Sequence, residues 1–367
     1  MDEEERAMLR VLQVVTKMDR GGLETMLMNY YRNIDRSLVQ FDFLLHREEK
    51  GAYDDEILSL GGRIYHVPRL NPLNPEYYKA LNRFFRDHRY AIVHSHLDCT
   101  NSFPLRAAKK AGVSTRIVHV HSTKLDFDYK FPVRAISKLL TPLYATDFFA
   151  CGETAGRWAF PNREFTVMRN AIDVEKYLPN QTVRQKTRKE FGLSSEFLVG
   201  HVGRFDYAKN HGFLLKVFSE LKRVEPNAKL MLVGDGEKRG EIKGEVSRLG
   251  LEQDVIFTGV RSDVNDLMQA MDVFVMPSLY EGFPVVMVEA QASGLPCVMS
   301  DKVPGESALV GGLVASVPLD EKVDVWVDAI LKAKKKARTS HFEELSSKGF
   351  DIKTAASWLA DYYLSKL

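Results

Sequence analysis

Short runs of β-branched and aromatic residues alternate with longer stretches of helical periodicity along almost the whole chain. This alternation is typical of parallel sheets whose strands are joined by crossover helices. It occurs in two successive series. The first predicts strands at Val11–Val15, Phe41–Leu45, Ile64–Val67, Ala91–His94, Arg116–Val120, Phe148–Cys151 and Phe165–Met168, and the second at Leu198–Val202, Lys229–Val233, Val255–Thr258, Val273–Met276 and Cys297–Ser300. The sequence therefore predicts an α/β protein with two Rossmann-like domains in tandem.

The boundary between these domains is expected near Asn170-Ala171-Ile172-Asp173, where the first strand series ends. A polar segment from Pro179 to Arg188 precedes the second series, as is common where a chain passes between domains. We therefore expect one domain at residues 1–175 and a second at 176–350. The remaining segment, 351–367, is predicted to form an amphipathic helix.

Composition narrows the class of protein. The chain has 51 basic and 49 acidic side chains, so its formal net charge of +2 indicates no global field for binding nucleic acid. Its three cysteines are widely spaced and form no CxxC pair, which argues against a disulfide framework or a thiolate zinc site. The acidic start is not followed by a long apolar run, and no stretch is long enough to span a bilayer. We expect a cytoplasmic protein.

Paired glycines, Gly21 and Gly22, follow the first predicted strand and open a predicted helix. Because glycine has no side chain, the backbone here can approach a ligand closely, and the free N–H groups of a helix start suit a phosphate or a sugar. A plain strand-to-helix turn explains the two glycines equally well.

Two cations follow the first predicted strand of the second domain. Arg204 and Lys209 are expected at the carboxyl edge of the sheet, where open α/β folds bind ligands. Together they could neutralise a diphosphate leaving group. The alternative is ordinary surface charge without a ligand.

A second loop in that domain, Glu281-Gly282-Phe283-Pro284, leads into a helix predicted to begin near Val285. The free N–H groups and positive dipole end of that helix suit phosphate oxygens. Glu289 lies early in the helix, eight positions after Glu281. Carboxylates accept hydrogen bonds from hydroxyls, so sugar and ribose hydroxyls are the natural partners. A helix-capping acid with an unrelated helix-face glutamate is the alternative.

Three further signals are weaker. Four histidines end two successive predicted strands: His94, His96, His119 and His121. A zinc site is conceivable there, but no carboxylate or thiolate completes it and hydrogen bonding is favoured. Asp126-Phe127-Asp128 is a DxD string, a pattern that holds metal-bound nucleotide diphosphates elsewhere but is frequent by chance. Gly234-Asp235-Gly236 predicts a tight turn beside a nucleotide rather than a dinucleotide fingerprint.

Taken together, these segments resemble the group 1, or family-4, retaining glycosyltransferases of GT-B fold, from about Val11 to the C-terminus. Among these, the chain looks most like bacterial exopolysaccharide and capsule enzymes. The elements that carry the resemblance are Gly21-Gly22-Leu23-Glu24, His119-Val120-His121, Asn170-Ala171-Ile172-Asp173, Gly203-Arg204 with Lys209, Phe257-Thr258-Gly259, and Glu281 to Glu289. The resemblance implies two Rossmann-like domains whose parallel sheets face across a cleft, with the C-terminal helix packing back on the N-terminal, acceptor-binding domain.

The resemblance also implies an activity. A hexosyl-type sugar would pass from a nucleoside diphosphate donor, most commonly a UDP-sugar, to a saccharide or a polyprenyl-diphosphate-linked saccharide. No bound metal or other cofactor is implied, and no carboxylate nucleophile, because the leaving phosphate itself helps to deprotonate the acceptor hydroxyl. The donor-binding residues that it implies are Gly21, Gly22, Arg204, Lys209, Val260, Arg261, Glu281, Gly282, Phe283, Pro284, Val285 and Glu289.

Individual roles follow from the same resemblance. Arg204 and Lys209 would grip the donor diphosphate together with the backbone after Glu281, which would itself contact hydroxyls of the donor sugar. Glu289 would bind ribose, and the backbone around Val260 and Arg261 would read the base. His121 would approach the sugar near the reacting carbon. The catalytic group is thus expected to be His121, Glu281, Arg204 and Lys209.

Two other functions remain open from the sequence. A nucleotide-sugar 2-epimerase shares the GT-B architecture, although the pattern of Arg204, Lys209 and the two glutamates favours transfer. A catalytically idle sugar-nucleotide-binding subunit is the third hypothesis. Separately, the apolar segment from Phe131 to Tyr144, with Arg134 and Lys138 interspersed, either contacts the inner membrane peripherally or packs in the core.

Overall fold

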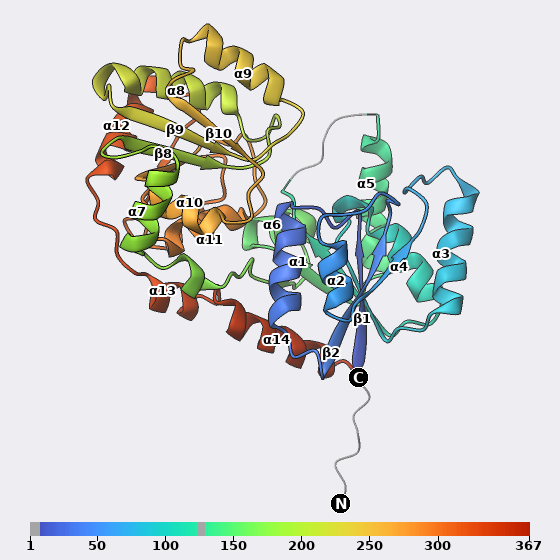
Figure 1. The fold of residues 1–367 in the computed structure, drawn as a ribbon. Coiled ribbons are helices and arrows are strands. Elements are labelled where there is room, and N and C mark those ends of the chain that lie inside the picture. The colour runs from blue at the N-terminus through green and yellow to red at the C-terminus, as the bar shows by residue number, and fades with distance from the viewer. Residues whose placement is uncertain (1–7, 124–128) are drawn as a thin grey trace, which may run out of the picture. The chain divides into compact units, whose positions relative to one another are not determined.

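The computed structural model describes residues 8–123 and 129–367. The chain divides into two compact units: unit 1 is Met1–Ala171 together with Ile352–Leu367, and unit 2 is Ile172–Asp351. The division thus falls within Asn170-Ala171-Ile172-Asp173. Each unit holds one parallel sheet flanked by helices (Figure 1). The prediction of a two-domain α/β fold with parallel sheets is confirmed.

The sheet of unit 1 has seven strands within the described residues, in the order β3-β2-β1-β4-β5-β6-β7, and every pairing is parallel. The strands are β1 (Leu9–Val15), β2 (Val39–Leu45), β3 (Arg63–His66), β4 (Ile92–Ser95), β5 (Thr115–Val120), β6 (Asp147–Ala150) and β7 (Thr166–Val167). The order runs outward in both directions from β1 and β4. These neighbours therefore mark the topological switch point, beside which open α/β sheets bind ligands.

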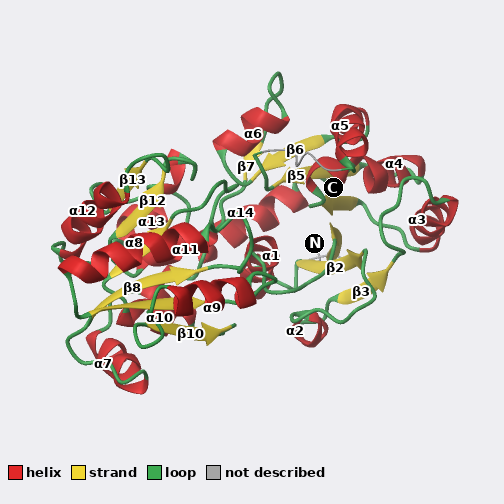
Figure 2. Cartoon of the chain, turned by 90° about the horizontal axis from the view of Figure 1, so that it is seen from above, coloured by secondary structure: helices red, strands yellow, loops and turns green. Residues whose placement is uncertain are grey.

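Helices cover both faces of this sheet. In Figures 1 and 2, α1 and α14 lie on one side of the sheet and α3 and α4 on the other. The helices of unit 1 are α1 (Gly22–Asn33), α2 (Asp54–Ser59), α3 (Pro75–Asp87), α4 (Ser102–Lys110), α5 (Phe131–Leu140), α6 (Glu153–Ala159) and α14 (Ile352–Leu364), with short 3-10 turns η1 (Asp98–Thr100) and η2 (Thr141–Leu143).

The C-terminal helix α14 completes the core of unit 1. Its apolar stripe, which includes Leu359 and Tyr363, is buried in one cluster with the core-facing side chains of α1, β1 and β2. Its neighbour Tyr362 donates a hydrogen bond to Asp147 of β6 at 2.6 Å. The last helix of the chain therefore folds with the first sheet, as the resemblance implied.

The sheet of unit 2 has six described strands in the order β10-β9-β8-β11-β12-β13, all paired in parallel. The strands are β8 (Phe197–Val202), β9 (Ala228–Val233), β10 (Val255–Gly259), β11 (Val273–Met276), β12 (Cys297–Ser300) and β13 (Val314–Val317). Here the switch point lies between β8 and β11. The edge strand β13 is an addition to the predicted series, because only one of its four residues is buried and they carry no clear strand pattern.

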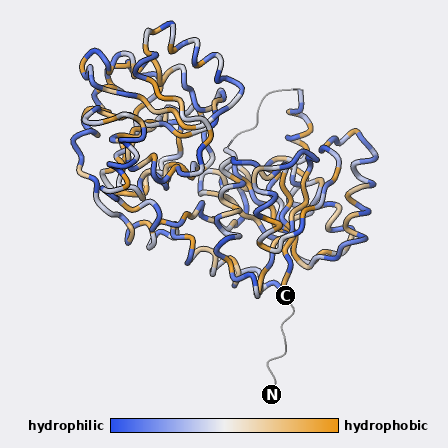
Figure 3. The backbone as a smooth tube through the Cα atoms, viewed as in Figure 1, coloured by the Kyte–Doolittle hydropathy of each residue, from blue (hydrophilic) through white to orange (hydrophobic). Residues whose placement is uncertain are grey.

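The helices of unit 2 alternate with these strands. They are α7 (Gln181–Glu190), α8 (His211–Val224), α9 (Arg239–Arg248), α10 (Val264–Ala270), α11 (Val285–Ala292), α12 (Val323–Lys334) and α13 (Phe342–Ser347), with 3-10 turns η3 (Val174–Tyr177) and η4 (Gly305–Ser307). Figure 3 shows that the strands of each unit are largely hydrophobic, as expected of sheets covered on both faces.

Two observations bear on membrane contact. None of the helices in residues 8–123 and 129–367 combines the length and the apolar character needed to cross a bilayer. On α5, however, the side chains of Ile136 and Leu139 are 58% and 78% exposed. Core packing therefore does not account for these two side chains, although other apolar side chains of the helix are partly buried.

Candidate functional site

The loops that follow β8 and β11 meet at the switch point of unit 2. The backbone N–H of Leu279 donates to the carbonyl of Ala208 at 2.7 Å. The side-chain amide of Asn210 donates to the carbonyl of Pro277 at 3.2 Å. Asn210 has a φ of 55°, a left-handed conformation that asparagine tolerates better than most residues. The two loops are therefore joined to each other at the carboxyl edge of the sheet.

An ion pair between these loops brings two of the predicted site residues together. Lys209 Nζ donates to Glu281 Oε1 at 2.6 Å, and the two side chains are only 17% and 12% exposed. An ammonium group has three N–H donors, so this bond leaves donors for a further acceptor. The pair holds a cation and a carboxylate at fixed positions over the end of β8.

Arg204 lies exposed on the loop after β8, and glycines on the neighbouring loop shape its backbone. Gly234 has a φ of 133°, and a Cβ added there would lie 2.1 Å from the carbonyl oxygen of Gly203. A Cβ at Gly236 would lie 2.5 Å from the carbonyl oxygen of Phe205. Phe205 N–H also donates to the carbonyl of Asp235 at 2.9 Å. The turn expected to lie beside a nucleotide is thus packed directly on the Arg204 loop.

Helix α11 begins at Val285, as predicted, directly after Phe283 and Pro284. Its N-cap residue is Pro284, which has no side-chain acceptor for the first N–H groups. Phe283 is buried and stacks on Phe350 with ring centroids 5.4 Å apart. The stacking anchors the loop.

Glu289 lies in the second turn of α11 and is partly buried. Burial raises the pKa of its carboxyl to about 7, and a hydrogen bond with Tyr177 of η3 partly opposes this rise. The carboxyl group is therefore poised between its two protonation states near neutral pH. Tyr177 was not among the residues singled out from the sequence.

Val260 and Arg261 follow β10, two strands away from β8. The side chain of Val260 is 54% exposed. Arg261 instead pairs with Asp263 at 2.6 Å and Glu190 at 3.2 Å, and these carboxylates raise the pKa of its guanidinium. Its side chain is thus engaged within unit 2, which leaves the backbone of this turn as the group open to a ligand.

In unit 1, Gly21 and Gly22 occupy the loop between β1 and α1. Gly21 is the N-cap of α1, and a Cβ added there would meet the Glu24 carboxylate at 2.3 Å. A Cβ at Gly22 would have no described atom within 4 Å. A side chain would therefore clash at Gly21, whereas the space beside Gly22 is open.

The four histidines of β4 and β5 form one cluster at the switch point of unit 1. Three of them, His94, His96 and His119, offer ring nitrogens within 4.8 Å of one another. The rings of His94 and His96 are stacked, with planes 24° apart and centroids separated by 4.3 Å. A metal ion lies close to the plane of each imidazole that binds it, and stacked rings do not point at a common ion. The arrangement suits hydrogen bonding better than a shared metal ion.

The DxD string Asp126-Phe127-Asp128 lies outside the described residues.

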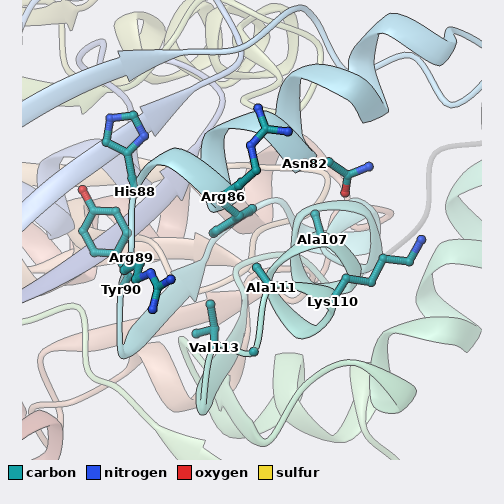
Figure 4. Close-up of a pocket in the computed structure, with 11 residues that line it drawn as sticks. Asn82, Arg86, His88, Arg89, Tyr90, Ala107, Lys110, Ala111 and Val113 are labelled. Carbon is teal, nitrogen blue, oxygen red and sulfur yellow. The ribbon is translucent and has the colours of Figure 1, made fainter.

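A surface hollow in unit 1 does not coincide with the predicted site. It has a volume of about 610 Å³ and is lined by Arg86, His88, Tyr90, Lys110 and Val113 among others (Figure 4). Tyr90 and Val113 precede β4 and β5, so this hollow lies at the amino edge of the sheet, opposite the loops described above.

The sequence reasoning missed three polar residues around the histidine cluster: Gln13, Asp98 and Tyr363. Gln13 is fully buried in the middle of β1, and an uncharged polar residue flanked on both sides by apolar residues, Leu12 and Val14, is a signal that could have found it. Asp98 accepts the backbone N–H of His121 at 2.7 Å, and burial raises its pKa to about 6. Tyr363 comes from α14, and no local pattern ties that helix to β4.

Two known sequence families match separate parts of the chain, and a known protein matches nearly all of it. The family "Glycosyl transferases group 1" matches residues 183–346, and the "Glycosyl transferase 4-like domain" matches residues 21–151. The putative glycosyltransferase EpsF of Bacillus subtilis is 40% identical over 368 residues, which covers 96% of each chain.

More distant relatives extend this comparison. A UDP-Gal:alpha-D-GlcNAc-diphosphoundecaprenol alpha-1,3-galactosyltransferase of Escherichia coli is 27% identical over 80% of each chain. A capsular polysaccharide biosynthesis glycosyltransferase, CapH of Staphylococcus aureus, is 24% identical over 98% of this chain and 99% of its own. The crystal structure of Anabaena HepE in complex with UDP superposes with a TM-score of 0.81 at 21% identity, covering 98% of this chain and 100% of that one, and this likeness supports the fold.

Proposed function

The chain belongs to the group 1 glycosyl transferases of GT-B fold and is a glycosyltransferase, and from that premise we propose that it transfers a hexosyl-type sugar from a UDP-sugar, with retention, to a saccharide or lipid-linked acceptor in cell-surface polysaccharide biosynthesis. The observation that carries this proposal is the Lys209–Glu281 pair at the switch point of unit 2. The polysaccharide context is supported by the names of the capsular and diphosphoundecaprenol-linked relatives.

Diphosphate recognition is assigned to three groups on the two joined loops. Arg204 and Lys209 supply positive charge, and the uncapped start of α11 supplies N–H groups and the positive end of a helix dipole. Preorganised donors of this kind stabilise charge that develops on a leaving diphosphate. The backbone from Gly282 to Val285 would lie along the phosphates.

Donor-sugar and nucleoside recognition is assigned to the two carboxylates and to the turn after β10. Glu281, held by Lys209, would accept hydrogen bonds from sugar hydroxyls. Glu289 would accept them from ribose. The backbone at Val260 and Arg261 would contact the base, in keeping with the engagement of the Arg261 side chain elsewhere.

Unit 1 is assigned to the acceptor and to part of the reacting sugar. Gly21 and Gly22 leave room for phosphate or acceptor near the start of α1, and His121 would contact the sugar beside the reacting carbon. We assign the deprotonation of the acceptor hydroxyl to the leaving phosphate. Charge stabilisation by Arg204, Lys209 and α11 would make a metal ion unnecessary.

Helix α5 is proposed as a peripheral membrane contact. Ile136, Leu139 and Leu143 of η2 are 58%, 78% and 59% exposed, and Arg134 lies on the same helix. Exposed apolar side chains beside basic ones suit the surface of an anionic bilayer. Such a contact would keep the enzyme near a lipid-linked acceptor at the cytoplasmic face.

The proposal is tested in two steps. First, a panel of nucleotide sugars is screened for protection against thermal unfolding, where a ligand at one hundred times its Kd adds about 2.7 kcal/mol. Second, the protecting donor is incubated with acceptors that include a diphosphoundecaprenol-linked sugar. Acceptor-dependent release of UDP and an α-linked product from an α-linked donor support retaining transfer. Epimerisation of the donor sugar without release of nucleotide would overturn the proposal, and the named relatives favour transfer over that outcome.

A further inference from the structure

A continuous chain of hydrogen bonds runs through the core of unit 1 and ends at His121. Its members are Gln13 of β1, Tyr363 of α14 and the four histidines that follow or end β4 and β5. Gln13, His94, His119 and Tyr363 have no exposed surface, and His96 is 2% exposed. His121 is only partly buried, so it is the member of the chain that a ligand can reach.

Each imidazole in this chain is neutral near pH 7. Burial lowers the pKa of His94 and of His121 to about 3 and holds those of His96 and His119 well below their usual range. A neutral imidazole has one N–H donor and one bare nitrogen that accepts. Which nitrogen carries the proton is decided by the partner of the other one.

The carboxamide of Gln13 sets the direction of the chain toward His121. Its oxygen lies 2.9 Å from His96 Nε2. An amide oxygen can only accept, so the proton of His96 is on Nε2 and its Nδ1 is bare. His96 Nδ1 lies 3.1 Å from His121 Nε2, which must therefore donate. This leaves the lone pair of His121 on Nδ1.

The other half of the chain agrees with this direction. The Gln13 amide nitrogen donates to the Tyr363 hydroxyl at 3.3 Å, so that hydroxyl donates its own proton to His94 Nδ1 at 2.7 Å. His94 Nε2 then donates to His119 Nδ1 at 3.2 Å. Because each bond determines the next, a flip of the Gln13 amide would reverse every bond at once.

A separate contact holds the backbone of His121. Its N–H donates to Asp98 Oδ1 at 2.7 Å, and Asp98 has a φ of 45°, an uncommon left-handed conformation for a residue other than glycine. The main chain is thus held by Asp98 and the ring by His96. The position and the tautomer of the His121 ring are therefore fixed before any ligand binds.

We propose that Gln13, His96 and Tyr363 are positioning residues that keep the proton of His121 on Nε2, so that Nδ1 accepts a hydrogen bond from a hydroxyl of the substrate. This inference rests on the proposed function, which brings His121 to the reacting sugar. It adds that the ring acts as an acceptor and that the C-terminal helix takes part in setting its tautomer.

The test uses the full-length protein with 15N-labelled histidine. Two-bond 15N–1H correlation spectra distinguish an Nε2–H ring from an Nδ1–H ring, and the His121 signals are assigned with His121→Asn. We expect His121 to be the Nε2–H tautomer. In Tyr363→Phe the Gln13 amide loses the partner that couples it to His94, so we expect both His121 tautomers to appear. The matched control is Tyr362→Phe, one residue away on the same helix, which should leave the His121 spectrum unchanged.

Activity is measured on the same variants. Tyr363→Phe should lower kcat about tenfold, as for one lost hydrogen bond, with the affinity for UDP unchanged. If Tyr363→Phe does not fold, Gln13→Met breaks the same chain and takes its place. The inference would be overturned by an Nδ1–H tautomer of His121 in the unaltered protein. It would also be overturned if the His121 spectrum were unchanged in both Tyr363→Phe and Gln13→Met. The spectra are read without any turnover, so a protein that shows the expected tautomer but no transfer would refute the proposed function alone.

Discussion

The hydroxyl group of Tyr363 lies 2.7 Å from Nδ1 of His94, although 269 positions separate the two residues in the sequence. Tyr363 belongs to α14 and His94 to β4, so this contact joins the last helix to the centre of the first sheet. The same tyrosine ring packs edge-on against Phe41 with centroids 6.1 Å apart. It therefore serves both the core and the histidine chain.

Replacing Tyr363 with alanine should destabilise unit 1 strongly. The side chain is fully buried, and removing a buried aromatic ring costs about 3–5 kcal/mol. Hydrogen exchange of the β1 and β2 amides under native conditions measures the loss within unit 1. Ser357→Ala, at an exposed position of the same helix, should change the exchange by less than about 0.5 kcal/mol. Equal exchange in both variants would contradict the placement of α14 in this core.

Removal of the Lys209 side chain should affect the reaction far more than folding. Lys209→Ala takes away the cation paired with Glu281, and loss of one preorganised charge partner lowers kcat by about 10²–10³-fold. Steady-state kinetics with the protecting nucleotide sugar measure the effect. Lys189→Ala removes an exposed lysine from α7 and should leave kcat within about twofold. A Lys209→Ala enzyme with full activity would refute the assignment of this loop to the diphosphate.

The carboxyl group of Glu289 should make the stability of unit 2 depend on pH. Burial raises its folded-state pKa to about 7 from an ordinary value of 4.5, so the folded state disfavours the charged form. The group therefore causes almost no loss of stability below pH 4.5, and a loss that grows as the pH rises from 4.5 to about 7 and levels off above that pH. Its full size is at most about 3 kcal/mol.

Glu289→Gln tests this sign. Glutamine cannot ionise, so the variant should gain stability over the unaltered protein at pH 8 and gain much less at pH 5. Urea unfolding at both pH values, monitored by hydrogen exchange of the α11 amides, gives the comparison. A difference that is the same at both pH values would show that the Glu289 carboxyl does not titrate as described.

A methyl group at Gly234 should disturb the Arg204 loop. The φ of 133° is unfavourable for alanine, by about 1–3 kcal/mol, and the added Cβ would overlap the carbonyl oxygen of Gly203. We expect Gly234→Ala to lower both the stability of unit 2 and its affinity for UDP. In contrast, Gly244→Ala, in an open position of α9, should stabilise by about 0.5–1 kcal/mol without altering UDP binding. Isothermal titration with UDP and thermal unfolding compare the two variants.

The apolar surface of α5 should be needed for membrane contact. A double change, Ile136→Ser with Leu139→Ser, removes two exposed apolar side chains and should weaken sedimentation with phosphatidylglycerol vesicles about tenfold or more. Leu73→Ser removes an even more exposed apolar side chain outside α5, and binding should not change. Vesicle binding that survives the double change would refute the proposed contact.

Much of the fold could be predicted because strand and helix patterns are local. The strand that ends at Val202 and the helix start at Val285 follow from runs of apolar residues and from the Pro284 before the helix. The edge strand Val314–Val317 could not, since four residues, of which only Val317 is buried, carry almost no periodic signal. Its assignment depends on pairing with β12, which is a tertiary contact.

The candidate site was predictable only in part, for the same physical reason. Arg204, Lys209 and Glu281 lie in the loops that follow β8 and β11, and the carboxyl ends of parallel strands meet at one edge. The turn at Gly234-Asp235-Gly236 is predicted to lie beside a nucleotide, and its glycines also allow the backbone of the neighbouring loop to pack closely, which the sequence does not reveal. The partner of His94 could not be found from spacing, because Tyr363 reaches it only through the packing of α14.

The return of α14 to unit 1 has a consequence for the order of events during synthesis. The ribosome makes every strand of the first sheet early, but the Tyr363 that fills its core follows all of unit 2 in the chain. Unit 2 is continuous and can fold as soon as it has emerged. Unit 1 therefore cannot complete its core until unit 2 and α14 have been made, and one face of its sheet stays incompletely covered until then. This reverses the usual order, in which N-terminal domains fold first.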